Sequence, residues 1–249
     1  MYKNIIITGA SDGIGFELCL LFAKNKARIY ANGRNKEKLE SLKEKCNNLG
    51  AEIEIFSGDV RNRESMLKWI ENIFSTNKNI DLVIANAGIS RADSSLKSEL
   101  SVIDINIVGV VNTIFPAIEL LKKQGIKSHI AITGSIAGYF VMPNSYSYSS
   151  SKVFCNALSE GLYLGLKPHN ISVSIINPGF VDTKLIQNSS YKTLFILNSN
   201  QAAKIIFKGL LKKKRIITFP LIVALLAKFY NIMPIFIKNS LQNLLSKGL

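Results

Sequence analysis

The chain has 249 residues, of which 47% are hydrophobic and 19% charged, and it carries a formal net charge of +14. This length suits one large α/β domain with a buried core, and the strong positive charge predicts an anionic partner or surface. Three cysteines without paired spacing and two distant histidines argue against a disulfide framework and a metal site, so we expect neither.

Short runs of β-branched residues alternate with amphipathic segments along the chain. The runs predict strands at residues 4–8, 27–32, 51–56, 80–85, 128–133, 171–177 and 215–219. The segments between them predict helices at residues 13–26, 35–49, 62–76, 96–124, 145–167 and 199–214, with Pro168 ending the fifth. Strict alternation of strand and helix predicts an α/β fold with a doubly wound parallel sheet. We expect this domain over residues 1–220 and an apolar helical extension over 221–249.

A glycine-rich turn joins the first predicted strand to the first predicted helix. Its sequence, TGASDGIG, places glycines at Gly9, Gly13 and Gly15. Glycines there allow a tight turn and let a diphosphate approach the backbone, while the helix N-terminus offers unpaired N–H groups. The turn therefore predicts a Rossmann-like dinucleotide site, and a plain flexible turn is the alternative.

The segment of residues 135–152, SIAGYFVMPNSYSYSSSK, combines a serine, a tyrosine and a lysine. Tyr148 and Lys152 are four residues apart, so on a helix they share one face. A phenol is a poor acid or base at neutral pH, but a nearby ammonium favours the phenolate and makes proton transfer accessible. Ser135 follows a predicted strand, where its hydroxyl can bind a substrate oxygen. The alternative is an aromatic residue packed beside a solvated lysine.

These motifs together resemble the short-chain dehydrogenase/reductase family, and the likeness covers roughly residues 3–220. Further family motifs stand in the expected order: Gly58-Asp59-Val60, Asn86-Ala87-Gly88, the asparagine of DINIVG, the serine thirteen residues before the tyrosine, and the segment of residues 178–183. The resemblance implies an oxidoreductase whose catalytic residues are Asn106, Ser135, Tyr148 and Lys152. In the family the asparagine holds a water that connects the lysine to solvent.

The resemblance also implies which residues hold the cofactor. They are Gly9, Ser11, Asp12, Gly13, Ile14, Gly15, Arg34, Asp59, Val60, Asn86, Ala87, Gly88, Tyr148, Lys152, Pro178, Gly179, Val181 and Thr183. Several have simpler alternatives: Asp59 as a helix cap, Asn86 as a turn residue, Asn106 as a buried structural amide and Thr183 as an N-cap.

The end of the second predicted strand bears on the choice of cofactor. Members of the family that prefer NAD usually carry an acid where Gly33 stands, and Arg34 follows it here. A guanidinium suits a 2′-phosphate by charge and geometry, so we expect NADP(H), with NAD(H) as the second choice. Asp12 opposes this choice, because many NADP-binding relatives place a basic residue there. NADPH favours carbonyl reduction, with alcohol oxidation or a non-catalytic dinucleotide sensor as alternatives.

The substrate and the partners are indicated by the last third of the chain. The apolar loop of residues 184–198 predicts an apolar carbonyl substrate, or else a lid that packs on the core. Beyond the lysines of residues 212–214, the uncharged run of residues 216–227 is too short to span a bilayer.

This tail, residues 212–249, predicts a peripheral membrane contact through two short helices that start at Pro220 and restart at Pro234. A pocket cover or the interface of a homodimer or homotetramer is the alternative. Because no signal segment begins the sequence, we expect a cytoplasmic protein. The basic residues are spread over many helices, so we expect no nucleic-acid partner.

Overall fold

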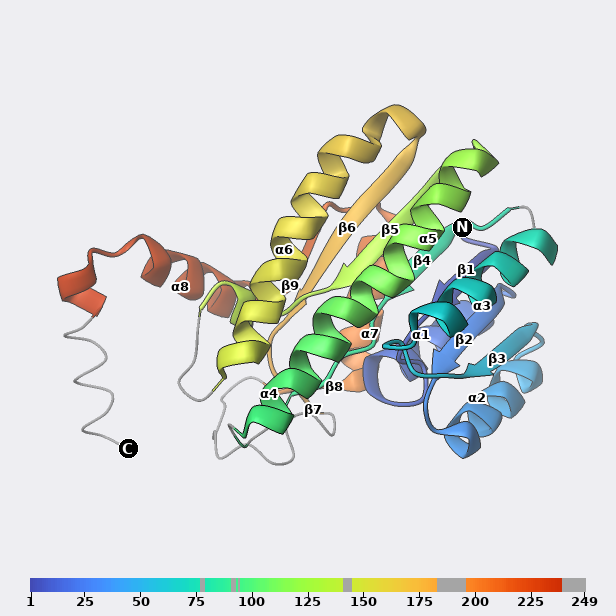
Figure 1. Ribbon diagram of the computed structural model, residues 1–249, viewed down its shortest axis with the longest axis horizontal. Helices are drawn as coiled ribbons and strands as arrows, with labels where there is room; N and C mark the ends of the chain where they lie inside the picture. Colours follow the sequence, from blue (N-terminus) through green and yellow to red (C-terminus); the bar gives the residue numbers. More distant parts are fainter. Residues whose placement is uncertain (77–78, 91–92, 94, 141–144, 183–195, 239–249) are drawn as a thin grey trace.

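The computed structural model describes residues 1–76, 79–90, 93, 95–140, 145–182 and 196–238 of the chain. A seven-stranded sheet runs through its middle, in the order β3-β2-β1-β4-β5-β6-β9, and every pair in it is parallel (Figure 1). The strands are β1 (Asn4–Ile7), β2 (Arg28–Gly33), β3 (Ile53–Ser57), β4 (Leu82–Ala85), β5 (Ser128–Thr133), β6 (Ile171–Pro178) and β9 (Ile216–Phe219). A separate two-stranded pair joins β7 (Val181–Asp182) to β8 (Leu197–Asn198).

Helices cover both faces of the large sheet. One face packs against α1 (Gly13–Ala23), α2 (Lys36–Asn48) and α7 (Ser199–Leu211). The other packs against α3 (Arg63–Thr76), α5 (Gly109–Gln124) and α6 (Tyr146–Leu166). Because both faces are covered, the strands are almost continuously apolar and buried, as in β1 and β4. The predicted doubly wound sheet is confirmed, with each predicted strand or helix within a few residues of its observed bounds.

The long predicted helix over residues 96–124 is present but is not uniform. It consists of α4 (Leu96–Ile103), a π-helical turn (Asp104–Val108) and α5. The N–H of Gly109 donates to the carbonyl of Asp104, five residues back, which is the π pattern. This wider turn holds Asn106 fully buried. The whole stretch is long and apolar enough to cross a membrane, but 56% of its most apolar window is buried inside the protein, as in a core helix.

A buried chain of side chains ties the N-terminus to the sheet. The Tyr2 hydroxyl lies 2.5 Å from Nδ1 of His129, and Nε2 of His129 lies 2.7 Å from the Ser174 hydroxyl. Ser174 donates to the Lys214 carbonyl at 2.6 Å. Burial lowers the pKa of His129 to about 4, so the imidazole is neutral at physiological pH.

The C-terminal part forms α8 (Leu221–Ile232), which projects at the side of the sheet (Figure 1). It packs on β9 and on the short 3-10 turn Ile136–Gly138 that follows β5. The chain is helical again at residues 235–238, directly after Pro234. In the described part of the extension, helical structure therefore stops before Pro234 and resumes after it, and residues 239–249 lie outside the described residues.

Candidate active site

The glycine turn after β1 is shaped by close backbone contacts. Gly9 and Gly13 have φ angles of 68° and 56°, in the left-handed region that favours glycine. A Cβ on Gly9 would lie 2.7 Å from the Cα of Ala87, and one on Gly15 would lie 2.2 Å from the Gly9 carbonyl oxygen. Both contacts are too short for a side chain. The turn therefore keeps its backbone against the end of β4.

The same turn offers backbone donors at the start of α1. The N–H of Ala10 donates to the Asn32 carbonyl, but those of Ser11, Ile14 and Gly15 donate to no group in the described part of the chain. Unpaired N–H groups at a helix N-terminus form a cradle for an anion, which fits the diphosphate of a dinucleotide. The Ile14 side chain packs into the core, so this residue faces the cradle only with its backbone.

Asp12 has structural partners in this turn. Its carboxylate accepts a hydrogen bond of 2.8 Å from the Gly13 N–H and so caps α1. It also forms an ion pair with Lys38 of α2. The Ser11 side chain lies beside Gly33, where an added Cβ would be 2.9 Å from both Cβ and Oγ of Ser11. This serine therefore occupies the space that an acidic side chain at position 33 would need.

Asn86 ties the ends of three strands together. Its Nδ2 donates to the carbonyls of Thr8 and Gly9 at 3.2 and 3.3 Å, and its Oδ1 accepts from the Thr133 hydroxyl at 3.3 Å. The Thr8 hydroxyl in turn accepts from the N–H groups of Asn86 and Ala87. Asn86 is thus a cross-strand link at the carboxyl edge, where doubly wound folds bind ligands.

Tyr148 and Lys152 share one face of α6, as their spacing predicted. The Lys152 side chain is only 5% exposed, and its Nζ donates to the Thr133 carbonyl at 3.0 Å. That ammonium lies 5.6 Å from the centre of the Tyr148 ring. Tyr148 is half-buried, and its hydroxyl has no hydrogen-bond partner within the described ranges. A buried cation thus lies beside a half-buried phenol.

Asn106 is both a structural amide and a neighbour of the lysine. Its side chain bonds to both backbone groups of Ile89, at 2.8 and 2.9 Å, and donates to the Ser151 hydroxyl at 3.1 Å. A Cβ on Gly88 would lie 3.3 Å from Oδ1 of Asn106 and 3.5 Å from Nζ of Lys152. The absence of a side chain at position 88 therefore leaves a small gap between the amide and the ammonium.

Ser135 sits at the start of the 3-10 turn after β5. Its Oγ accepts from the Ala137 N–H at 3.1 Å and donates to the Pro178 carbonyl at 3.4 Å. The same turn touches α6, because a Cβ on Gly138 would lie 2.7 Å from the Lys152 carbonyl oxygen. The serine, the tyrosine and the lysine therefore come from two elements in direct contact.

The segment after β6 is fastened to its neighbour β9. The N–H of Gly179 donates to the Phe219 carbonyl at 2.7 Å, and Gly179 also packs against Pro220. Val181 is buried in the core on the side of α7. Thr183 and most of the apolar loop of residues 184–198 lie outside the described residues.

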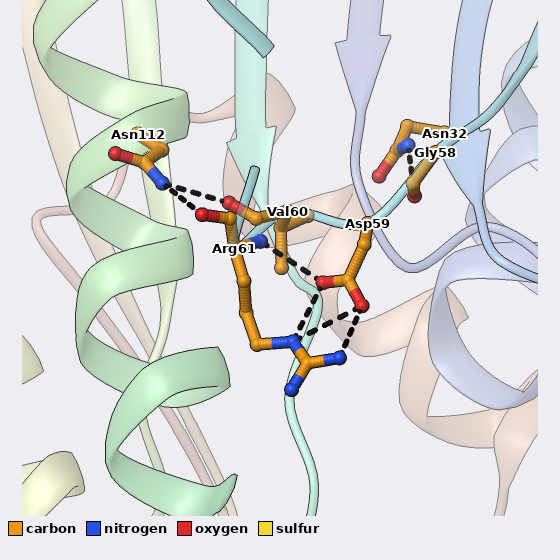
Figure 2. A network of polar contacts seen from close by, with 6 residues as sticks. All are labelled: Asn32, Gly58, Asp59, Val60, Arg61 and Asn112. Atoms are coloured by element: carbon orange, nitrogen blue, oxygen red, sulfur yellow. Dashed lines mark hydrogen bonds and ion pairs between the residues drawn. The ribbon is translucent and has the colours of Figure 1, made fainter. Parts of the chain in front are cut away.

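The segment after β3 holds a carboxylate clamped by a guanidinium (Figure 2). Arg61 donates to both oxygens of Asp59, with distances of 2.7 to 3.1 Å. These bonds, followed by the charges of Arg61 and Arg34, hold the pKa of Asp59 below its usual range. Asn112 of α5 fixes the backbone by donating to the carbonyls of Val60 and Arg61 at 2.9 and 3.3 Å.

One contact bears on the alternative role of Asp59, and the surroundings of Arg34 bear on the cofactor. Asn62, rather than Asp59, supplies the side chain that accepts from the first turn of α3, at 3.0 Å from the Ser65 N–H. The cap alternative for Asp59 is therefore wrong. Arg34 is exposed directly after β2, and its guanidinium forms no ion pair with any residue that the structure describes.

Several residues that contact the site belong to no sequence motif, so the sequence alone did not identify them. Thr133, which accepts from the lysine, and Ser151, which accepts from Asn106, come from a strand end and a serine-rich helix. Lys38 and Arg61 pair with site carboxylates from ordinary charged segments. Among the described residues, no cluster of three or more histidine, cysteine, aspartate or glutamate side chains has the arrangement of a metal site.

The fold and the glycine turn at this edge of the sheet are those of a Rossmann-like protein of the dinucleotide-binding class. A family profile described as short chain dehydrogenase matches residues 3–193. The chain therefore belongs to the short-chain dehydrogenase/reductase family, and it is an NAD(P)-dependent oxidoreductase.

Named relatives and solved structures agree with this membership. An uncharacterized oxidoreductase from Myxococcus xanthus is 26% identical, with 94% of this chain and 93% of the relative covered. The 17-beta-hydroxysteroid dehydrogenase 13 of Rattus norvegicus is 31% identical, with 88% and 75% covered. A short-chain dehydrogenase from Sphingobium yanoikuyae in complex with NADPH has a TM-score of 0.81 at 22% identity, with 98% and 95% covered. One from Burkholderia phymatum in complex with NAD has a TM-score of 0.84 at 20% identity, with 92% and 93% covered.

Proposed function

We propose that the protein reduces an apolar ketone or aldehyde to an alcohol with NADPH. The observation that carries this proposal is the buried Lys152 ammonium, which lies 5.6 Å from the centre of the Tyr148 ring on the same helix. When bound, the nicotinamide cofactor supplies the hydride. The protein binds and aligns the reactants and supplies the proton.

The residues of the edge divide this work between them. The Ser135 and Tyr148 hydroxyls bind the substrate oxygen, and Tyr148 donates its proton as the oxygen gains negative charge. The Lys152 ammonium stabilises the phenolate that remains, and Asn106 supports a water path across the gap at Gly88. Alcohol oxidation uses the same residues in reverse, with the phenolate as base.

The charges around Gly33 favour NADPH over NADH. No acid stands at position 33, and Ser11 fills the adjacent space. Two nearby carboxylates already have cationic partners. Asp12 pairs with Lys38. Asp59 pairs with Arg61, as Figure 2 shows. The Lys38 ammonium thus offsets the negative charge of Asp12, which would otherwise disfavour the 2′-phosphate of NADPH. Arg34 keeps a guanidinium for the 2′-phosphate of the cofactor.

The remaining cofactor contacts are proposed from position along the same edge. The glycine turn holds the diphosphate, residues 58–60 hold the adenine, and residues 86–88 line the ribose with Tyr148 and Lys152. Pro178, Gly179, Val181 and Thr183 hold the nicotinamide end. In this proposal residues 1–220 bind the cofactor and catalyse, while residues 221–249 form an extension.

We also propose that the protein works in the cytoplasm as a homodimer or homotetramer and contacts a membrane surface through the extension. The exposed apolar side chains of α8 support this contact. A membrane-bound enzyme would meet apolar carbonyl compounds where they accumulate, which agrees with the proposed substrate class.

The test follows NADPH oxidation against a panel of aldehydes and ketones that includes long-chain and sterol-like compounds. Tyr148→Phe should lower turnover by at least about 100-fold while cofactor binding, measured by NADPH fluorescence, stays within twofold. Tyr146→Phe is the matched control, because Tyr146 is 56% exposed and two residues away. Wild-type turnover in Tyr148→Phe would remove this tyrosine from the mechanism. Cofactor binding without turnover of any compound in either direction would favour the dinucleotide sensor.

A further inference from the structure

The exposed side of α8 is almost entirely apolar. The helix buries only a narrow stripe, Ala224 and Ala227, against Ile136. Because both residues of the stripe are alanines, α8 lies close to the rest of the domain, and its large apolar side chains point into solvent. Between 57% and 78% of each of the following is exposed: Leu221, Ile222, Leu225, Leu226, Phe229 and Ile232. We refer to these six as the apolar face. A contiguous exposed surface of this kind marks a contact with a membrane or another protein.

A groove with a basic rim lies directly beside the apolar face. It has a volume of about 540 Å³ and runs between α8, β9 and the end of α7. Ile205, Ile216 and Leu225 contribute to its apolar lining. Its rim carries Lys208, Lys212, Lys214 and Lys228, and its described lining contains no aspartate or glutamate. We call this feature the lysine-rimmed groove.

The charges of the groove are not balanced by the protein. Lys208, Lys212 and Lys214 form no ion pair with a described residue, while the neighbouring Arg215 pairs with Glu160 of α6. Lys228 lies over the ring of Tyr139, 4.9 Å from its centre. Positive charge therefore accumulates at one border of the apolar face, and Leu221, Leu225 and Lys228 belong to both α8 and the groove lining.

We propose that the apolar face and the lysine-rimmed groove form one docking surface for an anionic phospholipid bilayer. The apolar face inserts among the acyl chains, with α8 lying in the plane of the interface, because its 12 residues are too few to span a membrane. The four lysines bind headgroup phosphates, as basic segments beside membrane-active helices do. This inference rests on the proposed membrane contact but does not depend on the proposed reductase chemistry.

A second copy of the chain fits this surface less well. A two-fold interface would bring two basic surfaces together, in a chain whose net charge is already +14. An anionic bilayer matches both the apolar area and the charge. Docking also has a consequence for the site, because α8 packs on Ile136, the residue next to Ser135. The bilayer would then lie close to the turn that begins at Ser135.

The test is co-sedimentation of the full chain with phosphatidylcholine vesicles, with and without phosphatidylserine. We expect at least about tenfold stronger binding to the anionic vesicles and a marked loss at high salt. The variant Lys208→Gln/Lys212→Gln/Lys214→Gln should lose most of this binding. Lys36→Gln/Lys43→Gln/Lys123→Gln removes the same charge from α2 and α5 and should bind like the wild type.

Insertion is tested separately from charge. Leu225→Ser/Leu226→Ser should lose vesicle binding while its NADPH fluorescence and thermal unfolding stay close to wild type. A Phe229→Trp variant should show a blue-shifted emission with anionic vesicles and quenching by brominated acyl chains. Equal binding to both kinds of vesicle, or none to either, would overturn the proposal. A dimer that dissociates in Leu225→Ser/Leu226→Ser without any vesicle binding would assign the surface to a second copy. Because binding is measured without turnover, failure of the reductase assay leaves this result intact.

Discussion

Removing the Arg34 guanidinium should change cofactor selection and little else. The residue is exposed directly after β2 and has no ion-pair partner in the described structure. Its loss therefore leaves no buried charge without a partner. Hydrogen bonds to charged groups contribute about 1.5–3 kcal/mol, and water around an exposed side chain places Arg34 at the lower end. About 1.5 kcal/mol corresponds to roughly a tenfold weaker Kd for NADPH. The Kd for NADH, which lacks the phosphate, should stay within twofold.

The assay is fluorescence titration of NADPH and NADH into wild type, Arg34→Ala and Arg34→Lys. Lysine keeps the charge but loses the planar fork, so Arg34→Lys should fall between the other two. Lys24→Ala is the control, because it removes an exposed cation at the C-terminus of α1, at the end of this helix that is far from the glycine turn. The NADPH preference should also shrink as salt is raised. An unchanged ratio of the two affinities in Arg34→Ala would refute the assignment of this residue to the 2′-phosphate.

Three further predictions concern stability and the catalytic edge. Burial lowers the pKa of His129 from an ordinary 6.5 to about 4 in the folded chain. The unfolded chain therefore binds the proton more readily, so the free energy of unfolding falls as the pH drops from 6.5 to 4. Denaturant titrations should show about 3 kcal/mol of this loss at pH 4 in wild type but not in His129→Gln; identical pH profiles would contradict it. Gly88→Ala should crowd Asn106 and Lys152 and lower kcat by about tenfold with little change in Tm, whereas wild-type kcat would argue against the gap as a water path. Ser135→Ala should lower kcat/KM and also cost about 1 kcal/mol in unfolding experiments through loss of its cap to Ala137, while Ser135→Thr should restore both.

The parts of the fold that follow from local pattern could be predicted from the sequence. Buried parallel strands are apolar without interruption, as residues 171–177 are, so their positions and the helices between them follow from composition. The glycine turn and the Tyr148–Lys152 pair were predictable for the same reason, since each depends on spacing within one short segment. The end of α8 just before Pro234 likewise follows from a single residue.

Contacts between distant segments could not be predicted in this way. The Lys38 pair with Asp12 joins α2 to the start of α1, and the bond from Asn112 to the Val60 carbonyl joins α5 to the segment after β3. The π-helical turn at Asn106 has no local signature, because DINIV is compatible with an ordinary helix. The partners of Asn106, Ile89 and Ser151, are set by how three elements meet. Position in the family motif therefore located the asparagine but not its hydrogen bonds.

The strand that fastens the segment after β6 has a consequence for how the molecule matures during translation. Gly179 donates a hydrogen bond to Phe219 and packs against Pro220. Both partners are synthesised about forty residues later than Gly179. A nascent chain can build the central strands early, since domains fold from their N-terminal side as they are made. The Phe219 carbonyl of β9 can therefore bind the Gly179 N–H only after the central strands have been made.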